Sequence, residues 1–272
     1  MQTTQEHPLA SATLESWIDS LQASGKYSFL RARAIKESGL SQAAVSKALQ
    51  RSVKRGRIVK LKDYFYVIVP LEYRSAGAPP VSWFIRDLMA AMGLPYYVGL
   101  LSAAAVHGAS HHQPQEFQVM TDRSVREIVA SRTRIHFFAS RYVSRAAVMD
   151  VKTPTGPMRV STPETTAVDL VRFSRSAGRL DNVATVIAEM GALLDPKRLL
   201  AAIRVVDDVP SAQRLGYVLD RIRQRHLSEP VHKWLERQKP HALPLRSGRA
   251  VEGSRENRRW HLLVNEAIEV EI

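Results

Sequence analysis

Between residues 41 and 62, polar and cationic side chains recur at helical spacing. Gln42, Ser46 and Gln50 are four positions apart, which places them on one side of a helix. Gln can pair with adenine through two hydrogen bonds, and Ser can donate to or accept from a base edge. Lys can reach guanine, and neighbouring Lys and Arg can hold phosphates. We therefore expect a DNA-contacting set made of Ser41, Gln42, Ser46, Lys47, Gln50, Arg51, Lys54, Arg55, Arg57, Lys60 and Lys62.

Cationic charge is concentrated in the same part of the chain. The 272 residues carry a formal net charge of +13, and the stretch from Lys26 to Lys62 contains eleven Lys or Arg against one acid, Glu37. Five acids against those eleven bases leave residues 1–70 at +6, so the remaining +7 is spread over about 200 residues. This focused excess favours a polyanionic partner, although a basic balance alone would also suit a membrane surface.

Apolar periodicity predicts three short helices in residues 1–70. The first begins near Ser11 or Thr13 and ends at Gly25, the second covers about residues 30–38, and the third runs from an N-cap at Ser41 to Gly56. The side chains expected to face the core share three- and four-residue spacing. They are Leu14, Trp17, Ile18 and Leu21, then Leu30, Ala34 and Ile35, then Val45, Ala48, Leu49 and Val53.

Short β-rich segments complete this region at residues 26–29, 57–61 and 64–69. The order of helix, strand, helix, tight turn, helix and hairpin is that of a winged helix-turn-helix, whose second paired helix enters the major groove. The alternative is that a basic helix and hairpin form the solvated face of a small domain. We favour DNA binding because the charge excess peaks on the third helix and the hairpin.

Residues 70–80 interrupt all periodicity and are rich in Pro and Gly. We expect a DNA-binding domain at 1–70, a linker at 71–80 and a C-terminal domain at 81–272, in an α+β fold whose helices dominate the second half. The expected strands are 117–121, 134–138, a hairpin over 149–160, and 260–264. The expected helices are 82–92, 99–107, 163–173, 181–194, 196–206, 210–223 and 229–238.

Metal and cofactor chemistry is not indicated. The absence of Cys excludes disulfides, thiolate nucleophiles and Cys-based zinc sites. His111 and His112 follow His107 closely, but no carboxylate lies at ligand spacing, so we expect no metal there. His107 is interpreted as a hydrogen-bonded core histidine. No stretch of about eighteen apolar residues is present and the N-terminus does not resemble a secretory signal, which favours a cytoplasmic protein.

Catalytic patterns are also missing. Glu164 and Asp169 are five residues apart, which separates them on a helix, and Glu164 is interpreted as a favourable first-turn acid after the N-cap Thr162. Ser102 is not in a G-x-S-x-G elbow, and no glycine-rich phosphate loop is present. We therefore expect no catalytic residue, and an enzyme is the third and least favoured class of function.

Four stretches of the chain resemble the AbiEi family of antitoxins, which are the antitoxin halves of type IV abortive-infection toxin–antitoxin pairs in bacteria. They are GLSQAAVSKALQRSVKRGRIVK with YFYVIVPLEY, YYVGLLSAAAVHGASHHQP with EFQVMTD, MRVSTPETTAVDLVRF, and NRRWHLLVN. The resemblance implies an N-terminal domain that represses its own operon by binding promoter inverted repeats. It also implies a C-terminal domain that neutralises a nucleotidyltransferase-like toxin from the adjacent gene, with or without direct contact.

Two alternatives stay open at this point. The chain could be a winged-helix transcriptional regulator whose C-terminal domain senses a ligand or dimerises. Dispersed Arg residues in that domain are either solvated charge or a second contact surface for nucleic acid or an acidic protein. They are Arg123, Arg126, Arg132, Arg134, Arg141, Arg145, Arg172, Arg175 and Arg179.

Overall fold

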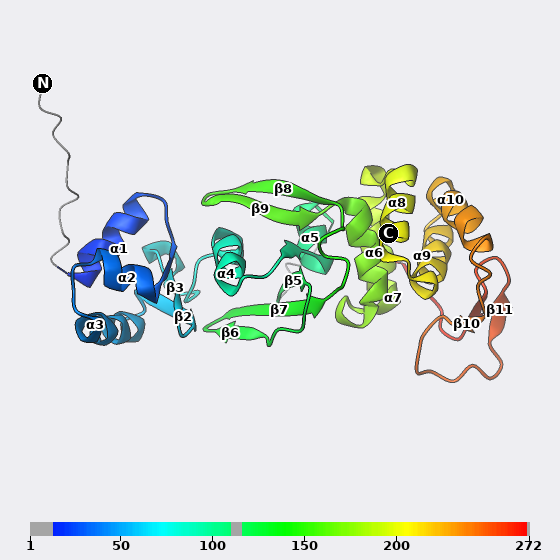
Figure 1. Ribbon diagram of the computed structural model, residues 1–272. Coiled ribbons are helices and arrows are strands. Elements are labelled where there is room, and N and C mark those ends of the chain that lie inside the picture. Colours follow the sequence, from blue (N-terminus) through cyan, green and yellow to red (C-terminus); the bar gives the residue numbers. More distant parts are fainter. Residues whose placement is uncertain (1–12, 110–115, 271–272) are drawn as a thin grey trace, which may run out of the picture. The chain divides into compact units, whose positions relative to one another are not determined.

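The computed structural model describes residues 13–109 and 116–270 and has a mixed α+β fold with helices in the second half, as predicted (Figure 1). The chain divides into two compact units. Unit 1 comprises Met1–Leu94, Arg126–His136 and Val151–Met158, and unit 2 comprises Pro95–Val125, Phe137–Asp150 and Arg159–Ile272. His111 and His112 lie outside the described residues.

The first part of unit 1, residues 13–69, is called the N-terminal module. Its elements follow the predicted order: α1 (Leu14–Ala23), β1 (Ser28–Leu30), α2 (Arg31–Glu37), α3 (Gln42–Lys54), β2 (Ile58–Lys62) and β3 (Phe65–Ile68). The strands form an antiparallel sheet in the order β1-β3-β2, and β2 contains a bulge between Lys60 and Lys62. The hairpin β2–β3 follows α3 in the chain after a short turn.

Amphipathic stripes on α1 and α3 build the core of the module. All four predicted residues of α1 are buried, and Trp17 meets the ring of Phe29 edge-on at 5.1 Å. Thr13 caps α1 because its Oγ1 accepts the N–H of Ser16 at 3.1 Å. In α3, Val45, Ala48 and Leu49 are buried as predicted.

Two residues predicted to be buried in the module are exposed. Val53 is 37% exposed, and Ser52 takes the buried place because a 3.6-residue period from Val45 passes through position 52. Leu30 is 39% exposed because it is the extended N-cap of α2 and not part of that helix's apolar stripe. Ile35 is half-buried.

Residues 71–92 pack within unit 1 as well. They form η1 (Leu71–Tyr73), η2 (Val81–Trp83) and α4 (Ile85–Met92). The indole of Trp83 lies edge-on to the rings of Tyr27 and Tyr73, with centroids 4.7 and 5.3 Å apart, and Ser28 Oγ donates to Asp87 Oδ2 at 2.7 Å. The division of the chain into functional domains at residues 71–80 stays a prediction.

A six-stranded sheet follows, in the order β6-β7-β5-β4-β9-β8. Its strands are β4 (Tyr96–Val98), β5 (Phe117–Thr121), β6 (Ile128–Ala130), β7 (Thr133–Ala139), β8 (Val148–Thr153) and β9 (Gly156–Ser161). Strand β4 pairs antiparallel with β5 and parallel with β9. The short β6, which the sequence pattern did not indicate, pairs with β7 and contacts β2 inside unit 1.

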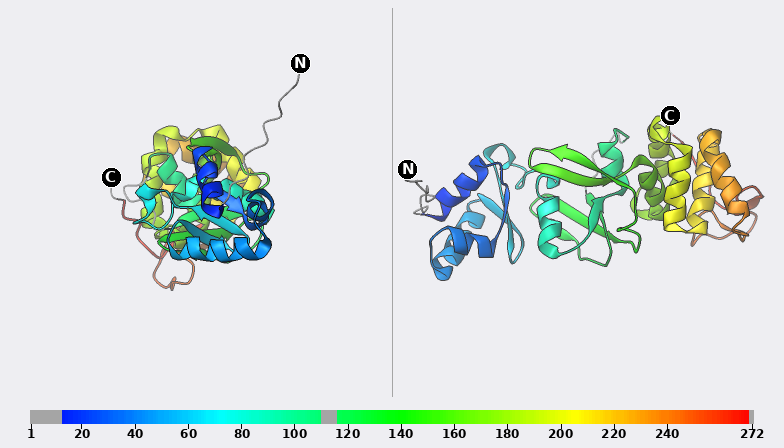
Figure 2. Two further views of the ribbon diagram at one scale, coloured as in Figure 1. Left: turned by 90° about the vertical axis from the view of Figure 1, so that its left-hand side faces the viewer. Right: turned by 45° about the horizontal axis from the view of Figure 1, so that its top comes forward.

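Helices dominate the rest of unit 2, where the yellow and orange ribbons pack side by side (Figure 2). They are α5 (Leu100–Val106), α6 (Pro163–Arg172), η3 (Ser174–Ser176), α7 (Arg179–Met190), η4 (Gly191–Leu193), α8 (Pro196–Val206), α9 (Val209–Arg221) and α10 (Arg225–Glu236). The chain ends in a small sheet of β10 (Leu243–Pro244), β11 (Arg255–Asn257) and β12 (Leu262–Val264). In the described parts of the chain, no helix is long and apolar enough to span a membrane.

Two acids of α6 are buried and hydrogen-bonded inside unit 2. Glu164 is a first-turn acid as predicted, but it is also 1% exposed: its Oε1 accepts the N–H of Asp195 at 3.1 Å and pairs with Arg198 at 3.0 Å. Asp169 Oδ2 accepts a hydrogen bond from the Tyr97 hydroxyl, with 2.8 Å between the two oxygen atoms. His107 Nε2 lies 2.8 Å from the carbonyl oxygen of Ser161, which confirms its hydrogen bond, although His107 is half-buried.

Burial raises the pKa of the Asp169 carboxyl to about 6, against the opposing effects of the Tyr97 hydrogen bond and the Arg172 charge. Burial, together with the Asp169 charge, also raises the pKa of Tyr97. The folded chain thus binds a proton on Asp169 more readily than the unfolded chain does. The contribution of this group to stability is therefore fully present below its unfolded pKa and falls as the pH rises through about 6.

We expect Asp169→Asn to remove this pH dependence, because an amide oxygen can still accept from Tyr97 and carries no charge to bury. We compare the free energy of unfolding of the variant with that of wild type at each pH. The variant minus wild-type difference is expected to increase by roughly 2–3 kcal/mol from about pH 4 to about pH 7. Urea unfolding at each pH measures this difference. The exposed Asp150→Asn is the control, and a parallel profile for Asp169→Asn and wild type would contradict the expectation.

Candidate nucleic-acid interface

Helix α3 is fixed at both ends by its sequence. Gly39 and Gly56 adopt φ values of +71° and +67°, which L side chains rarely tolerate, so the chain turns sharply before and after the helix. Ser41 is the N-cap, and its Oγ accepts the N–H of Ala44 at 3.3 Å. With Val45 and Leu49 buried, the opposite side of α3 faces solvent.

The outward side of α3 presents five polar or cationic side chains that make no hydrogen bond or ion pair within residues 13–109 and 116–270. All five are exposed, and they are called the α3 ridge: Gln42, Lys47, Gln50, Arg51 and Lys54. Side chains that satisfy no internal contact keep their donors and acceptors available for a ligand. The glutamines predicted to read bases thus lie together with three cations of the predicted DNA-contacting set.

The two predicted serines have internal partners. Ser41 caps the helix, as described above. The Ser46 hydroxyl donates to the carbonyl oxygen of Gln42 at 2.8 Å and accepts from Arg31 Nη2 at 2.7 Å. Reading of a base by Ser46 would therefore require the exchange of one of these hydrogen bonds.

Arg31 belongs to the same surface but was not among the predicted site residues. It is the first residue of α2, and its guanidinium reaches across to Ser46 on α3. The two residues are fifteen positions apart, so no helical or strand periodicity relates them. By contrast, Arg33 is held by Glu37, and this hydrogen bond lowers the pKa of the Glu37 carboxyl.

Cations at the end of α3 and along the hairpin carry internal ion pairs. Arg55 Nη1 lies 2.9 Å from Glu15, Arg57 Nη2 lies 2.5 Å from Asp19, and Lys60 Nζ lies 3.1 Å from Asp63. The acids in these pairs are exposed, and exposed pairs contribute about 0–1 kcal/mol, so a phosphate can compete for the cation. Lys62 is half-buried on β2.

The dispersed arginines of the sheet region have mixed surroundings. Arg123 pairs with Asp122 and Arg134 pairs with Glu127, which favours the interpretation as solvated charge for these two. Three other guanidinium groups stack on the ring of Tyr142 at 4.8–5.5 Å from its centroid, and they belong to Arg141, Arg145 and Arg172.

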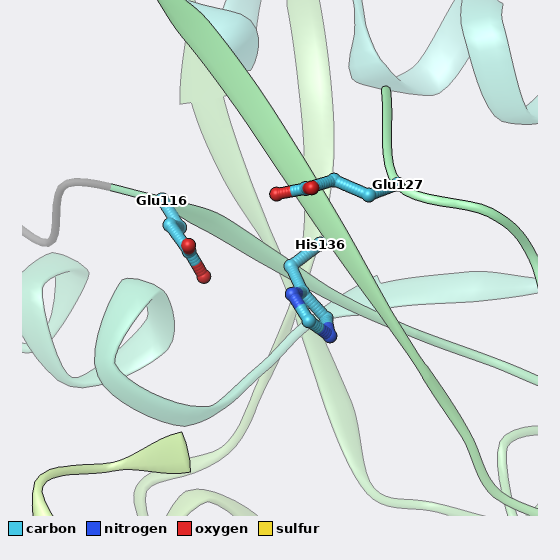
Figure 3. A group of neighbouring side chains, drawn as sticks. All are labelled: Glu116, Glu127 and His136. Atoms are coloured by element: carbon cyan, nitrogen blue, oxygen red, sulfur yellow. The ribbon is translucent and has the colours of Figure 1, made fainter. Parts of the chain in front are cut away.

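Figure 3 shows Glu127 and His136 near the β6–β7 hairpin of unit 1. Both are potential metal ligands by residue type. The carboxylate of Glu127 is 2.9 Å from Arg134 Nη1, and the third side chain in the figure, Glu116, belongs to unit 2. We assign no metal centre to these residues.

Comparisons with known proteins agree with this architecture. Residues 97–221 match the family described as the AbiEi antitoxin C-terminal domain. No curated protein sequence matches the chain. Among solved structures, the chain is similar to the crystal structure of the RV2827C protein from Mycobacterium tuberculosis, with 14% identity and a TM-score of 0.64 over 90% of this chain and 89% of that one. At this identity the similarity shows a shared fold. The match over residues 97–221 supports an AbiEi family antitoxin, the family that the sequence motifs predicted.

Proposed function

We propose that the chain represses its own operon by inserting the α3 ridge into promoter inverted repeats, and that it neutralises a nucleotidyltransferase-like toxin encoded beside it. The observation that carries the DNA-binding half is the α3 ridge, whose glutamines and cations are exposed and have no internal partners among the described residues. The toxin half rests on the match of residues 97–221 to the AbiEi antitoxin C-terminal domain.

In this proposal, some residues of the interface contact base edges and others contact phosphates. Gln42 and Gln50 pair with bases in the major groove, while Lys47, Arg51 and Lys54 hold the strands on either side. Arg31 fixes Ser46 at the centre of this surface. The hairpin adds phosphate contacts through cations that exchange their carboxylate partners for phosphate, and these are Arg55, Arg57 and Lys60.

A genetic experiment tests both halves together. The neighbouring gene is expressed from an inducible promoter with and without this chain, and the operon promoter drives a reporter in the same cells. We expect growth arrest by the neighbouring gene, recovery of growth with the chain, and repression of the reporter. Repression without a toxic neighbour would instead favour the alternative, a transcriptional regulator with a ligand-sensing or dimerising C-terminal domain.

A substitution on the α3 ridge separates base reading from general affinity. We expect Gln50→Ala to lower affinity for the operator by about 1–3 kcal/mol, the value of one good bidentate base contact, and to leave affinity for unrelated duplexes nearly unchanged. Fluorescence anisotropy with both duplexes measures the two affinities. The matched control is Gln238→Ala, also an exposed glutamine. Equal losses on operator and unrelated DNA would show that Gln50 does not read a base.

A further inference from the structure

Unit 2 contains a pocket of about 720 Å³ that the proposed function does not use. It lies between the end of α6, η3, the start of α7 and the segment after β10. Its apolar wall includes Phe173, Leu180 and Leu245. Pockets of about 300–1,000 Å³ with such walls and a few convergent polar groups are typical of small-molecule sites.

The polar lining of this pocket is strongly cationic. Five arginines line it: Arg172, Arg175, Arg179, Arg214 and Arg246. Glu266 is the one carboxylate among the described lining residues, and its Oε1 is shared between Arg246 and Arg249. Arg172 also lies 3.7 Å from Asp169 and 4.0 Å from Asp208, which are outside the lining, so the uncompensated positive charge of the pocket comes mainly from Arg175 and Arg179.

Two of these guanidinium groups are available for a ligand. Arg175 and Arg179 are exposed, and neither has a carboxylate partner within the part of the chain that the structure describes. The hydrogen bond of Arg175 goes to the carbonyl oxygen of Ser247 at 3.4 Å, and Arg179 is the first residue of α7. No side chain of the described residues caps the first N–H groups of α7, although Asp181 in the same turn opposes an anion there.

A third arginine connects two walls of the pocket by hydrogen bonds. Arg214 donates to the carbonyl oxygens of Leu245 at 2.8 Å and Pro244 at 3.0 Å, and to Ser247 Oγ at 3.2 Å. These bonds attach the segment after β10 to α9. Burial lowers the pKa of the Arg214 guanidinium, which indicates that its charge is poorly solvated and would gain from an anion nearby.

We propose that this pocket binds a phosphorylated small molecule of nucleotide size, with its phosphates on Arg175 and Arg179 and its remaining part against Phe173 and Leu180. Arginine suits this role because its planar fork donates two parallel hydrogen bonds to phosphate oxygens. The site belongs to unit 2, whereas the α3 ridge belongs to unit 1, so the two proposals can fail separately.

Isothermal titration of the full-length chain at constant ionic strength tests the proposal, with ATP, GTP and inorganic pyrophosphate as probes. We expect saturable one-to-one binding of at least one nucleotide, and at least a tenfold loss of affinity in Arg175→Ala/Arg179→Ala. The matched control is Arg204→Ala/Arg237→Ala, which removes the same charge from exposed positions outside the pocket and should bind like wild type. Far-UV circular dichroism checks that both double variants are folded.

Three results would overturn the proposal. The first is the absence of saturable binding of any probe to the wild-type chain. The second is an equal loss in the two double variants, which would mean that net charge alone attracts the probes. The third is a tenfold loss for duplex DNA with no effect on the nucleotides, which would make the pocket a DNA contact and not a small-molecule site.

Discussion

Reversing two charges on the α3 ridge, with Arg51→Glu/Lys54→Glu, is expected to abolish operator binding at physiological salt. Both side chains are exposed and unpaired among the described residues, so the variant replaces two phosphate-binding cations with two repulsive charges and does not disturb the core. We expect affinity to fall at least a hundredfold, which is about 3 kcal/mol. The magnitude of the log–log salt slope should fall by about 0.9 for each phosphate that the variant no longer neutralises.

The control for this variant is the equal charge change Lys233→Glu/Arg237→Glu in the last turn and at the C-cap of α10, where both residues are exposed. Fluorescence anisotropy at several salt concentrations gives affinity and slope for both variants. If the α10 variant loses as much affinity as the α3 variant, binding follows net charge and not the ridge, and the assignment of α3 fails.

Removing the indole of Trp260 is expected to destabilise unit 2 more than any surface change. Trp260 is fully buried, its Nε1 donates to Asp220 Oδ2 at 2.7 Å, and its ring fills the space that a side chain at Gly216 would need. A Cβ at Gly216 would lie 2.0 Å from Trp260 Cζ3, so helix α9 and the indole fit together through this glycine. Deleting such a side chain leaves a cavity and costs about 3–5 kcal/mol.

For Trp260→Ala we expect the melting temperature of unit 2 to fall by at least about 6 °C, since each kcal/mol shifts a domain of this size by about 2–4 °C. Differential scanning calorimetry measures the shift, and loss of antitoxicity at growth temperature should accompany it. The neighbouring exposed Arg258→Ala is the control. Gly216→Ala should destabilise the same packing from the opposite side. A melting temperature within about 2 °C of wild type for Trp260→Ala would contradict this role of the C-terminal segment.

Much of the fold could be predicted because local signals agree with tertiary packing. Helix α1 begins after Thr13, the second of the two starts that the sequence allowed, and ends two residues before Gly25. Helix α8 begins at Pro196 after the N-cap Asp195. Helix α3 combines an N-cap, an apolar stripe and a terminal glycine, so its outward residues follow from the sequence once its buried side is known. The α3 ridge was predictable for this reason.

Other features depend on contacts that no local pattern encodes. Strand β6 has three residues and is defined by its pairing with β7 and its contact with β2, not by alternation. The position of Arg31 beside Ser46 follows from the packing of α2 on α3. Val53 was misplaced because both Ser52 and Val53 satisfy an approximate i, i+4 rule, and hydrophobicity alone favours Val.

The arginine-lined pocket shows the same limit at a proposed ligand site. Arg172, Arg175 and Arg179 are close in sequence, but Arg214 and Arg246 join them only through the folding of α9 and the segment after β10. In the sequence these residues look like dispersed charge on solvated surfaces. The fold brings the five guanidinium groups to one cavity, and no spacing rule could have done so.

The most direct test of the central claim is the affinity of the wild-type chain for one promoter inverted repeat and for a shuffled duplex of equal length and composition. Fluorescence anisotropy at physiological salt should give a specificity ratio of at least about 10³, the lower range for specific DNA-binding proteins. That ratio should fall markedly in Gln42→Ala/Gln50→Ala. Equal affinities of the wild-type chain for the two duplexes would contradict the account.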